Sequence, residues 1–128
     1  MADVQVGARA SVPRRRQGVT VGFVVDGTEG HLVTAALPDG RLSDVLLSVD
    51  KQGSTLAGMT EALSLALTTG LRAGAPLSAY VEELRVTRYP PAGPTDDPDI
   101  PRTTSLGDYL VRRLDVDYPA GVRRSEHR

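Results

Sequence analysis

Residues 54–72, STLAGMTEALSLALTTGLR, form a strongly periodic stretch of the chain. Apolar side chains recur in this stretch at three- and four-residue spacing, at Leu56, Met59, Leu63, Leu67 and Leu71. This spacing predicts an amphipathic helix with one apolar face. Such a face has to pack against another element, so the fold depends on what the flanking sequence provides.

Three short strands are predicted before this helix. In residues 19–25, VTVGFVV, the alternate positions are apolar, and 31–37 and 44–49 also have the composition or alternation of strands. Turn sequences, DGTEG at 26–30 and PDG at 38–40, separate them. Short strands joined by tight turns predict an antiparallel meander, and a bare three-stranded sheet needs a covering layer.

More elements are predicted after the helix. Gly74 suits its C-terminal end and Pro76 the start of a second helix that ends near Arg85. Residues 89–102 contain five prolines and predict an extended connector, after which a short helix starts at Thr103 or Thr104. The predicted class is therefore α+β: a three-stranded antiparallel meander covered on one face by two helices, then a Pro-rich connector and a short C-terminal helix.

The charge distribution suggests domain boundaries. Residues 17–118 carry 14 acidic residues and 8 Lys or Arg, a balance of −6. The flanks carry seven arginines against two acids, a balance of +5. We expect disordered basic tails at 1–17 and 119–128 around a single domain at 18–118. An acidic body also makes a nucleic-acid partner improbable, because nucleic-acid binders usually present a basic face on the fold.

The composition excludes several functions. The chain has no cysteine, which rules out thiol redox chemistry, a cysteine nucleophile and zinc knuckles. Its apolar runs are too short for a membrane span, and its first residues do not resemble a secretory signal. We therefore expect a cytoplasmic protein without a membrane partner.

The stretch KQGSTLAG at 51–58 resembles a phosphate-binding loop. It lacks the order of a Walker A motif, because Lys51 precedes the glycine. Gly53, Ser54 and Thr55 fall at a predicted helix start, whose free N–H groups favour an anion, and Lys51 is the only lysine. The sequence leaves two interpretations open: a phosphate or nucleotide site, or a simple helix cap.

The connector supplies further candidates for ligand binding. Arg88 could bind a phosphate or Asp99, and Tyr89 could stack a base or close the edge of the core. Asp96, Asp97 and Asp99 form an acidic cluster without the spacing of a calcium loop, so we predict no metal site. No cofactor is predicted.

Motifs over roughly residues 19–118 resemble the C-terminal accessory domain, of the TSCPD type, of adenosylcobalamin-dependent class II ribonucleotide reductases. They are Lys51, Gly53, Ser54 and Thr55; Gly58; Gly74, Pro76 and Leu77; Thr87, Arg88 and Tyr89; Pro98, Asp99 and Ile100; and Ser105, Asp108 and Tyr109. In those enzymes the domain follows a catalytic barrel with the cobalamin site and the radical cysteine. This chain has neither the barrel nor any cysteine, so the resemblance implies that it does not reduce ribonucleotides.

Three functions remain open at this point. The first is a non-catalytic binding module for a nucleotide or another phosphorylated ligand. The second is a protein-interaction subunit for a separately encoded reductase or biosynthetic enzyme, which predicts an exposed apolar patch. The third is an enzyme with an unrecognised site that uses His31 or Asp99. An open sheet edge would also permit a homodimer.

Overall fold

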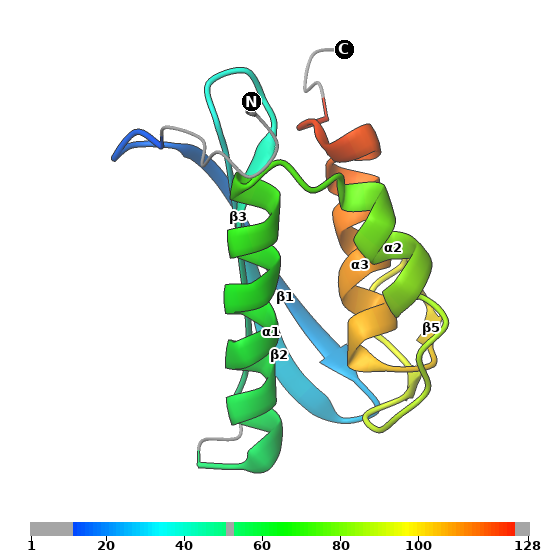
Figure 1. The fold of residues 1–128 in the computed structure, drawn as a ribbon. Coiled ribbons are helices and arrows are strands. Elements are labelled where there is room, and N and C mark those ends of the chain that lie inside the picture. Colours follow the sequence, from blue (N-terminus) through cyan, green and yellow to red (C-terminus); the bar gives the residue numbers. More distant parts are fainter. Residues whose placement is uncertain (1–11, 51–52, 125–128) are drawn as a thin grey trace.

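The computed structural model describes residues 12–50 and 53–124. Three strands, β1 (Gln17–Val25), β2 (Thr28–Ala36) and β3 (Leu42–Val49), form an antiparallel sheet in the order β1-β2-β3 (Figure 1). Asp26 and Gly27 join β1 to β2 with φ of 47° and 83°, the left-handed pair that tight hairpins require. The predicted meander is confirmed.

Three helices follow the sheet: α1 (Thr55–Arg72), α2 (Leu77–Leu84) and α3 (Leu106–Asp117). Between α2 and α3 the connector forms two very short paired strands, β4 (Gly93–Pro94) and β5 (Arg102–Thr103), which the sequence did not predict. The α+β class is confirmed. Within the described residues no helix is long and apolar enough to cross a membrane.

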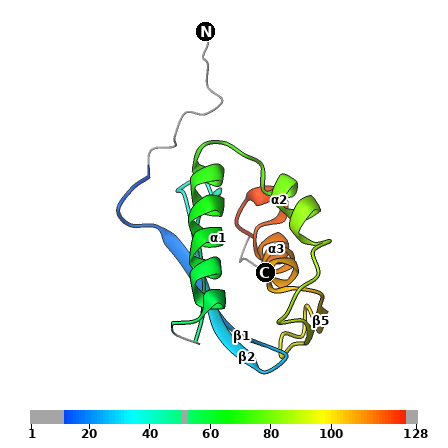
Figure 2. The same cartoon turned by 60° about the horizontal axis from the view of Figure 1, so that its bottom comes forward.

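The layer over the sheet is built by α1 and α3. Figures 1 and 2 show α1 beside β3, with α2 and α3 together on the other side of the molecule. From α3, Tyr109 lies 5.0 Å from Phe23 between ring centroids, and Tyr118, just past the helix, shares a 2.8 Å hydrogen bond with Thr34 of β2. The helix α2 adds Leu77 to the core and packs mainly on α3.

The helix α1 closes the outer edge of β3 with hydrogen bonds from side chains. Ser64 Oγ accepts the Leu47 N–H at 2.8 Å, and Thr68 Oγ1 accepts the Val45 N–H at 3.0 Å. One turn further on, Arg72 Nε donates to a carbonyl of the same strand. The spacings match, because four helical residues rise about 6 Å and two strand residues about 6.6 Å. The edge of β3 is therefore satisfied within the chain.

We expect Ser64→Ala to destabilise the domain by about 1–3 kcal/mol, because the buried Leu47 N–H would lose its acceptor. Urea denaturation measures this change. Ser78→Ala on α2 is the matched control, since Ser78 is exposed and should change stability by less than about 0.5 kcal/mol. Equal effects from the two variants would contradict the role given to Ser64.

Within the described residues, the opposite edge of the sheet, on β1, is covered only at its end, where the connector contacts Val24 and Val25. Val25 bridges to Thr95, and the Asp96 N–H donates to the Val24 carbonyl at 3.1 Å. Among the described residues, 17–22 of β1 are therefore the part of this edge that could pair with a second copy of the chain. A homodimer stays a prediction.

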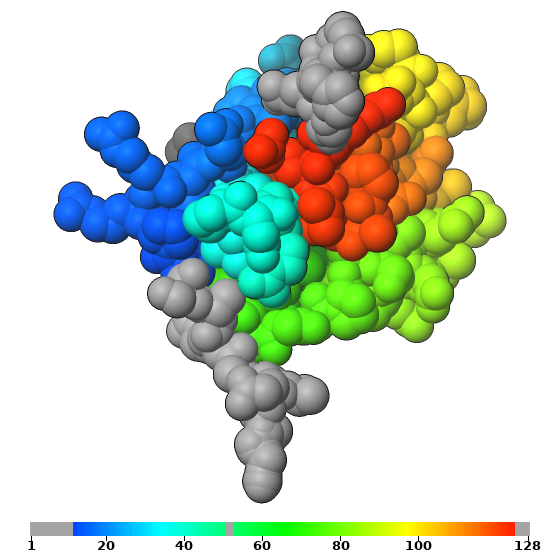
Figure 3. Space-filling view, turned by 90° about the horizontal axis from the view of Figure 1, so that it is seen from above, coloured from blue at the N-terminus to red at the C-terminus, as the bar shows by residue number. Residues whose placement is uncertain are grey.

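The folded part of the chain extends further than the expected boundaries 18 and 118. Arg16 pairs with Asp44 at 2.9 Å, and Pro119–Gly121 form a short 3-10 turn. Val122 then bridges to Arg41, so the segment after α3 lies against the β2–β3 turn (Figure 3). The sequence analysis expected a disordered tail at 119–128, whereas Val122 and the Arg123 N–H, which donates to the Gly40 carbonyl, contact the β2–β3 turn in the structure. The remaining tail residues, 1–11 and 125–128, lie outside the described residues.

Candidate functional site

The proline connector is held to α3 by a buried carboxylate. Asp97 accepts hydrogen bonds from the Tyr109 hydroxyl at 2.7 Å and from Arg113 Nη1 at 2.9 Å. Arg113 is itself buried and also pairs with Asp99 at 3.1 Å and Asp117 at 2.9 Å. This set, which we call the Asp97 clamp, fixes the position of residues 95–100 against the helix.

Burial and hydrogen bonding shift the pKa values of Asp97 and Tyr109 in the clamp. Burial alone would raise the pKa of Asp97, but hydrogen bonds from Tyr109 and Arg113 prevail and leave its pKa below the ordinary value. The pKa of Tyr109 is raised, first by burial and then by its bond to Asp97. Asp97 is therefore an ionised structural acceptor, and Tyr109 keeps its proton as the donor.

A second carboxylate organises the start of α3. Asp108 accepts hydrogen bonds from Thr103 Oγ1 at 2.7 Å, from the Thr104 N–H at 3.1 Å and from Arg112 Nη2 at 2.8 Å. Tyr89 reaches the same helix start, where its hydroxyl accepts the Gly107 N–H at 2.9 Å. These contacts bring the two ends of the connector together beside the first turn of α3.

An open hollow of about 570 Å³ lies at this junction, and we call it the arginine hollow. It is lined by Asp26, Arg88, Tyr89, Pro90, Ala92, Gly93, Arg102, Thr103, Thr104 and Arg112. Among the described residues the side chains of Arg88 and Arg102 have no ion-pair or hydrogen-bond partner, whereas Asp108 holds Arg112 in place. Asp26 is the one acid in this lining. Because Asp108 neutralises Arg112, the unpaired guanidinium groups of Arg88 and Arg102 against the Asp26 carboxylate give the hollow its excess of positive charge.

The structure separates the residues that the sequence grouped as ligand candidates. Arg88 and Tyr89 line the arginine hollow, but Asp99 does not. Of the two partners left open for Arg88, Asp99 pairs with Arg113 in the structure, and phosphate binding by Arg88 stays a prediction. Arg102 and Arg112 were missed, since only the pairing of Gly93 with Thr103 brings the segment after the last proline back to Arg88.

The helix start at 53–55 is a cap in this structure. Gly53 has a φ of 71°, Ser54 Oγ accepts the Ala57 N–H at 3.0 Å, and α1 begins at Thr55. Lys51 lies outside the described residues. Anion binding at this helix start stays a prediction.

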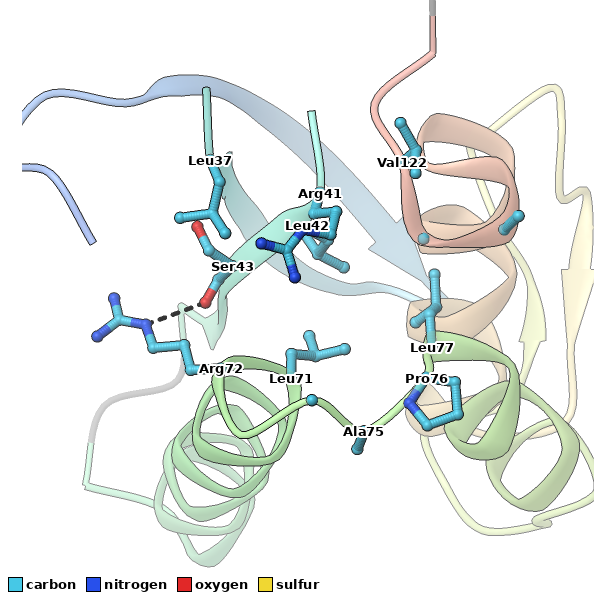
Figure 4. Close-up of a pocket in the computed structure, with 13 residues that line it drawn as sticks. Leu37, Arg41, Leu42, Ser43, Leu71, Arg72, Ala75, Pro76, Leu77 and Val122 are labelled. Carbon is cyan, nitrogen blue, oxygen red and sulfur yellow. Dashed lines mark hydrogen bonds between the residues drawn. The ribbon is translucent and has the colours of Figure 1, made fainter. Parts of the chain in front are cut away.

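A smaller hollow of about 190 Å³ lies at the other end of the molecule, between the β2–β3 turn, the end of α1 and the start of α2 (Figure 4). It contains two arginines, Arg41 and Arg72. Arg72 donates to the Ser43 carbonyl at 3.2 Å and pairs with Asp44, and Arg41 pairs with Asp39 at 2.9 Å. Because both guanidinium groups are occupied, this hollow is a weaker anion site than the arginine hollow.

The residues proposed for catalysis do not form a reactive group. His31 is exposed on β2, with Nδ1 3.6 Å from Asp50, and Asp99 belongs to the Asp97 clamp. In the part of the chain that the structure describes, no group of three or more His, Cys, Asp or Glu side chains is arranged to hold a metal ion.

The fold and these contacts define a small α+β domain whose second half is a clamped connector beside an arginine-lined hollow. The model of the TSCPD domain matches residues 6–118, and the chain belongs to this family. It is 46% identical over 110 residues to the vitamin B12-dependent ribonucleotide reductase of Streptomyces avermitilis, and 38% identical over 111 residues to that of Bradyrhizobium diazoefficiens. The two alignments each cover 86% of this chain but only 11% and 9% of the relatives. No solved structure gives a significant match.

This chain is therefore similar to only a small part of much larger enzymes. The absence of cysteine fits a domain without reductase activity of its own. The resemblance inferred from the sequence is confirmed.

Proposed function

We propose that the chain is a non-catalytic binding module of the TSCPD family that holds a phosphorylated ligand, of the nucleotide class, in the arginine hollow. One observation carries the proposal: Arg88 and Arg102 face an open hollow without any partner in the described residues. Guanidinium groups bind phosphate oxygens through paired N–H donors, and two unpaired ones in the lining of one hollow suit a phosphate chain.

The remaining lining supports a nucleotide over a bare anion. Tyr89 is 40% exposed, so its ring can offer a face on which a base stacks, while its hydroxyl accepts the Gly107 N–H. Thr103 and Thr104 flank the arginines, and the Asp26 carboxylate can accept a hydrogen bond from a sugar hydroxyl. The relatives are named as ribonucleotide reductases, whose substrates are nucleotides.

Thermal-shift measurements with ATP, dATP, GTP, dGTP and pyrophosphate test this proposal. A ligand at about 100 times its Kd stabilises the native state by about 2.7 kcal/mol. The double variant Arg88→Ala/Arg102→Ala should weaken binding by about tenfold or more, because each lost hydrogen bond to a charged group contributes about 1.5–3 kcal/mol.

Arg85→Ala is the matched control, because Arg85 is an exposed arginine nearby in sequence that does not line the hollow. It should leave binding unchanged. Asp26→Asn separates the two ligand types: it should tighten pyrophosphate binding, by removing a repelling charge, and weaken nucleotide binding relative to pyrophosphate. A flat screen, or equal loss of binding in Arg85→Ala, would refute the proposal.

A further inference from the structure

A second, apolar depression adjoins the arginine hollow, and we call it the Met59 groove. Its volume is about 520 Å³, and it is lined by Leu47, Thr55, Leu56, Met59, Thr60, Leu63, Leu84, Tyr89, Pro90 and Leu106. One wall is the first half of α1, and the other is formed by the end of α2, Tyr89–Pro90 and the start of α3.

Apolar side chains of α1 remain exposed or partly exposed in this groove. Met59 is 62% exposed although it belongs to the apolar stripe of α1, and Leu56 and Leu63 are only partly covered. The opposite wall is too far away to bury them, because α2 packs on α3 instead of on α1. Methionine adapts to different apolar surfaces and is common in grooves that receive helices.

Positive potential flanks the groove at two places. Its lining includes Thr55, the first residue of α1, and that helix has no acidic side chain in its first turn. Tyr89 and Pro90 form a wall shared with the arginine hollow, which brings Arg88 and Arg102 next to the groove. An occupant with carboxylates at its ends would meet the helix dipole at one side and free guanidinium groups at the other.

We propose that the Met59 groove docks an amphipathic helical segment of a partner protein, with apolar residues one turn apart in the groove and acidic residues toward Arg88 and Arg102. The segment would bury Met59, Leu56 and Leu63 against its own apolar face. This gives the chain a protein partner of defined chemistry in addition to a phosphorylated ligand. Because both use Arg88 and Arg102, the two occupants compete at their shared end.

Selection from a displayed library of random 16-residue peptides against the full chain tests this assignment. The enriched peptides should share apolar residues at i and i+3 or i+4, followed by Asp or Glu. Fluorescence anisotropy with one enriched peptide should then show at least tenfold weaker binding to Met59→Glu, and weaker binding to Arg88→Ala/Arg102→Ala.

Leu65→Glu is the matched control, because Leu65 is 64% exposed on the same helix but does not line the groove. It should bind the peptide as the parent chain does. Met59→Glu should also keep the thermal shift given by ATP, which separates this proposal from the nucleotide site.

Several outcomes would overturn the proposal. They are no enrichment, enriched peptides without acidic residues, or equal losses in Met59→Glu and Leu65→Glu. A concentration-dependent dimer that Met59→Glu abolishes would assign the groove to a second copy of this chain instead. Light scattering of the parent chain and the variant distinguishes that case.

Discussion

Replacing Asp97 with alanine is expected to lower the free energy of unfolding by about 3–5 kcal/mol, because it removes a charge-assisted hydrogen bond to Arg113 and leaves the buried Tyr109 hydroxyl without an acceptor, while Arg113 keeps Asp99 and Asp117. Arg113, 8% exposed, would lose one of its carboxylates, and the Tyr109 hydroxyl would lose its acceptor. Since domains of this size are stable by about 5–15 kcal/mol, the variant should lose a large part of its stability. Guanidinium denaturation followed by circular dichroism measures the change.

The control for this prediction is Asp115→Ala on the same helix. Asp115 is exposed and has no hydrogen-bond or ion-pair partner among the described residues, so its loss should change stability by less than about 0.5 kcal/mol. A loss below about 1 kcal/mol for Asp97→Ala would mean that the clamp opens in solution.

Acid should weaken the same contacts in the parent chain. The pKa of Asp97 is lowered in the folded state, as are those of Asp44 and Asp108, in each case because hydrogen bonds outweigh burial. Their stabilisation is therefore fully present above the ordinary carboxyl pKa near 3.8 and is lost as the pH falls through the lower folded values. Asp97→Ala should show a smaller loss of stability over this acid range than the parent chain.

Truncating Leu110 to alanine is expected to destabilise the domain by about 2–5 kcal/mol, through lost burial and the cavity left behind. Leu110 is fully buried in the common core although it lies on α3, far along the chain from the sheet. The size of this effect tests the finding that α3 is part of the layer over the sheet. Thermal unfolding by calorimetry gives the measurement.

Leu65→Ala provides the comparison, because this leucine is 64% exposed on α1. Its truncation should cost less than about 0.5 kcal/mol, since alanine is also a strong helix former. If Leu110→Ala were as mild as Leu65→Ala, α3 would have to be peripheral to the fold.

The two candidate surfaces depend on the clamp in the same way. Arg88 precedes the connector, Arg102 ends it and Arg112 lies on α3, so their proximity requires a fixed path for the residues between them. The Asp97 clamp and the pairing of β4 with β5 fix that path. We therefore expect variants that loosen the clamp to impair ligand binding as well as stability.

The sequence by itself determined the three strands of the sheet, the three α-helices and their order along the chain. The period of apolar residues predicts the three strands and α1, because it reflects which face of each element is buried. The family motifs and the cap at Ser54 are equally local: the TSCPD model matches residues 6–118, and Ser54 Oγ accepts the Ala57 N–H in the structure. The absence of cysteine set the limit on the chemistry directly.

The tertiary structure alone decided which polar residues meet. Local sequence could not show that Asp99 forms an ion pair with Arg113 and not with Arg88, or that Arg102 and Arg88 line the same hollow. Nor could it show that α3, which follows a proline-rich connector, covers the sheet together with α1. It also could not show that α2 packs on α3 and leaves Met59 exposed. The physical reason is that periodicity records burial along one element, whereas contacts between distant side chains depend on the path of the connector between elements.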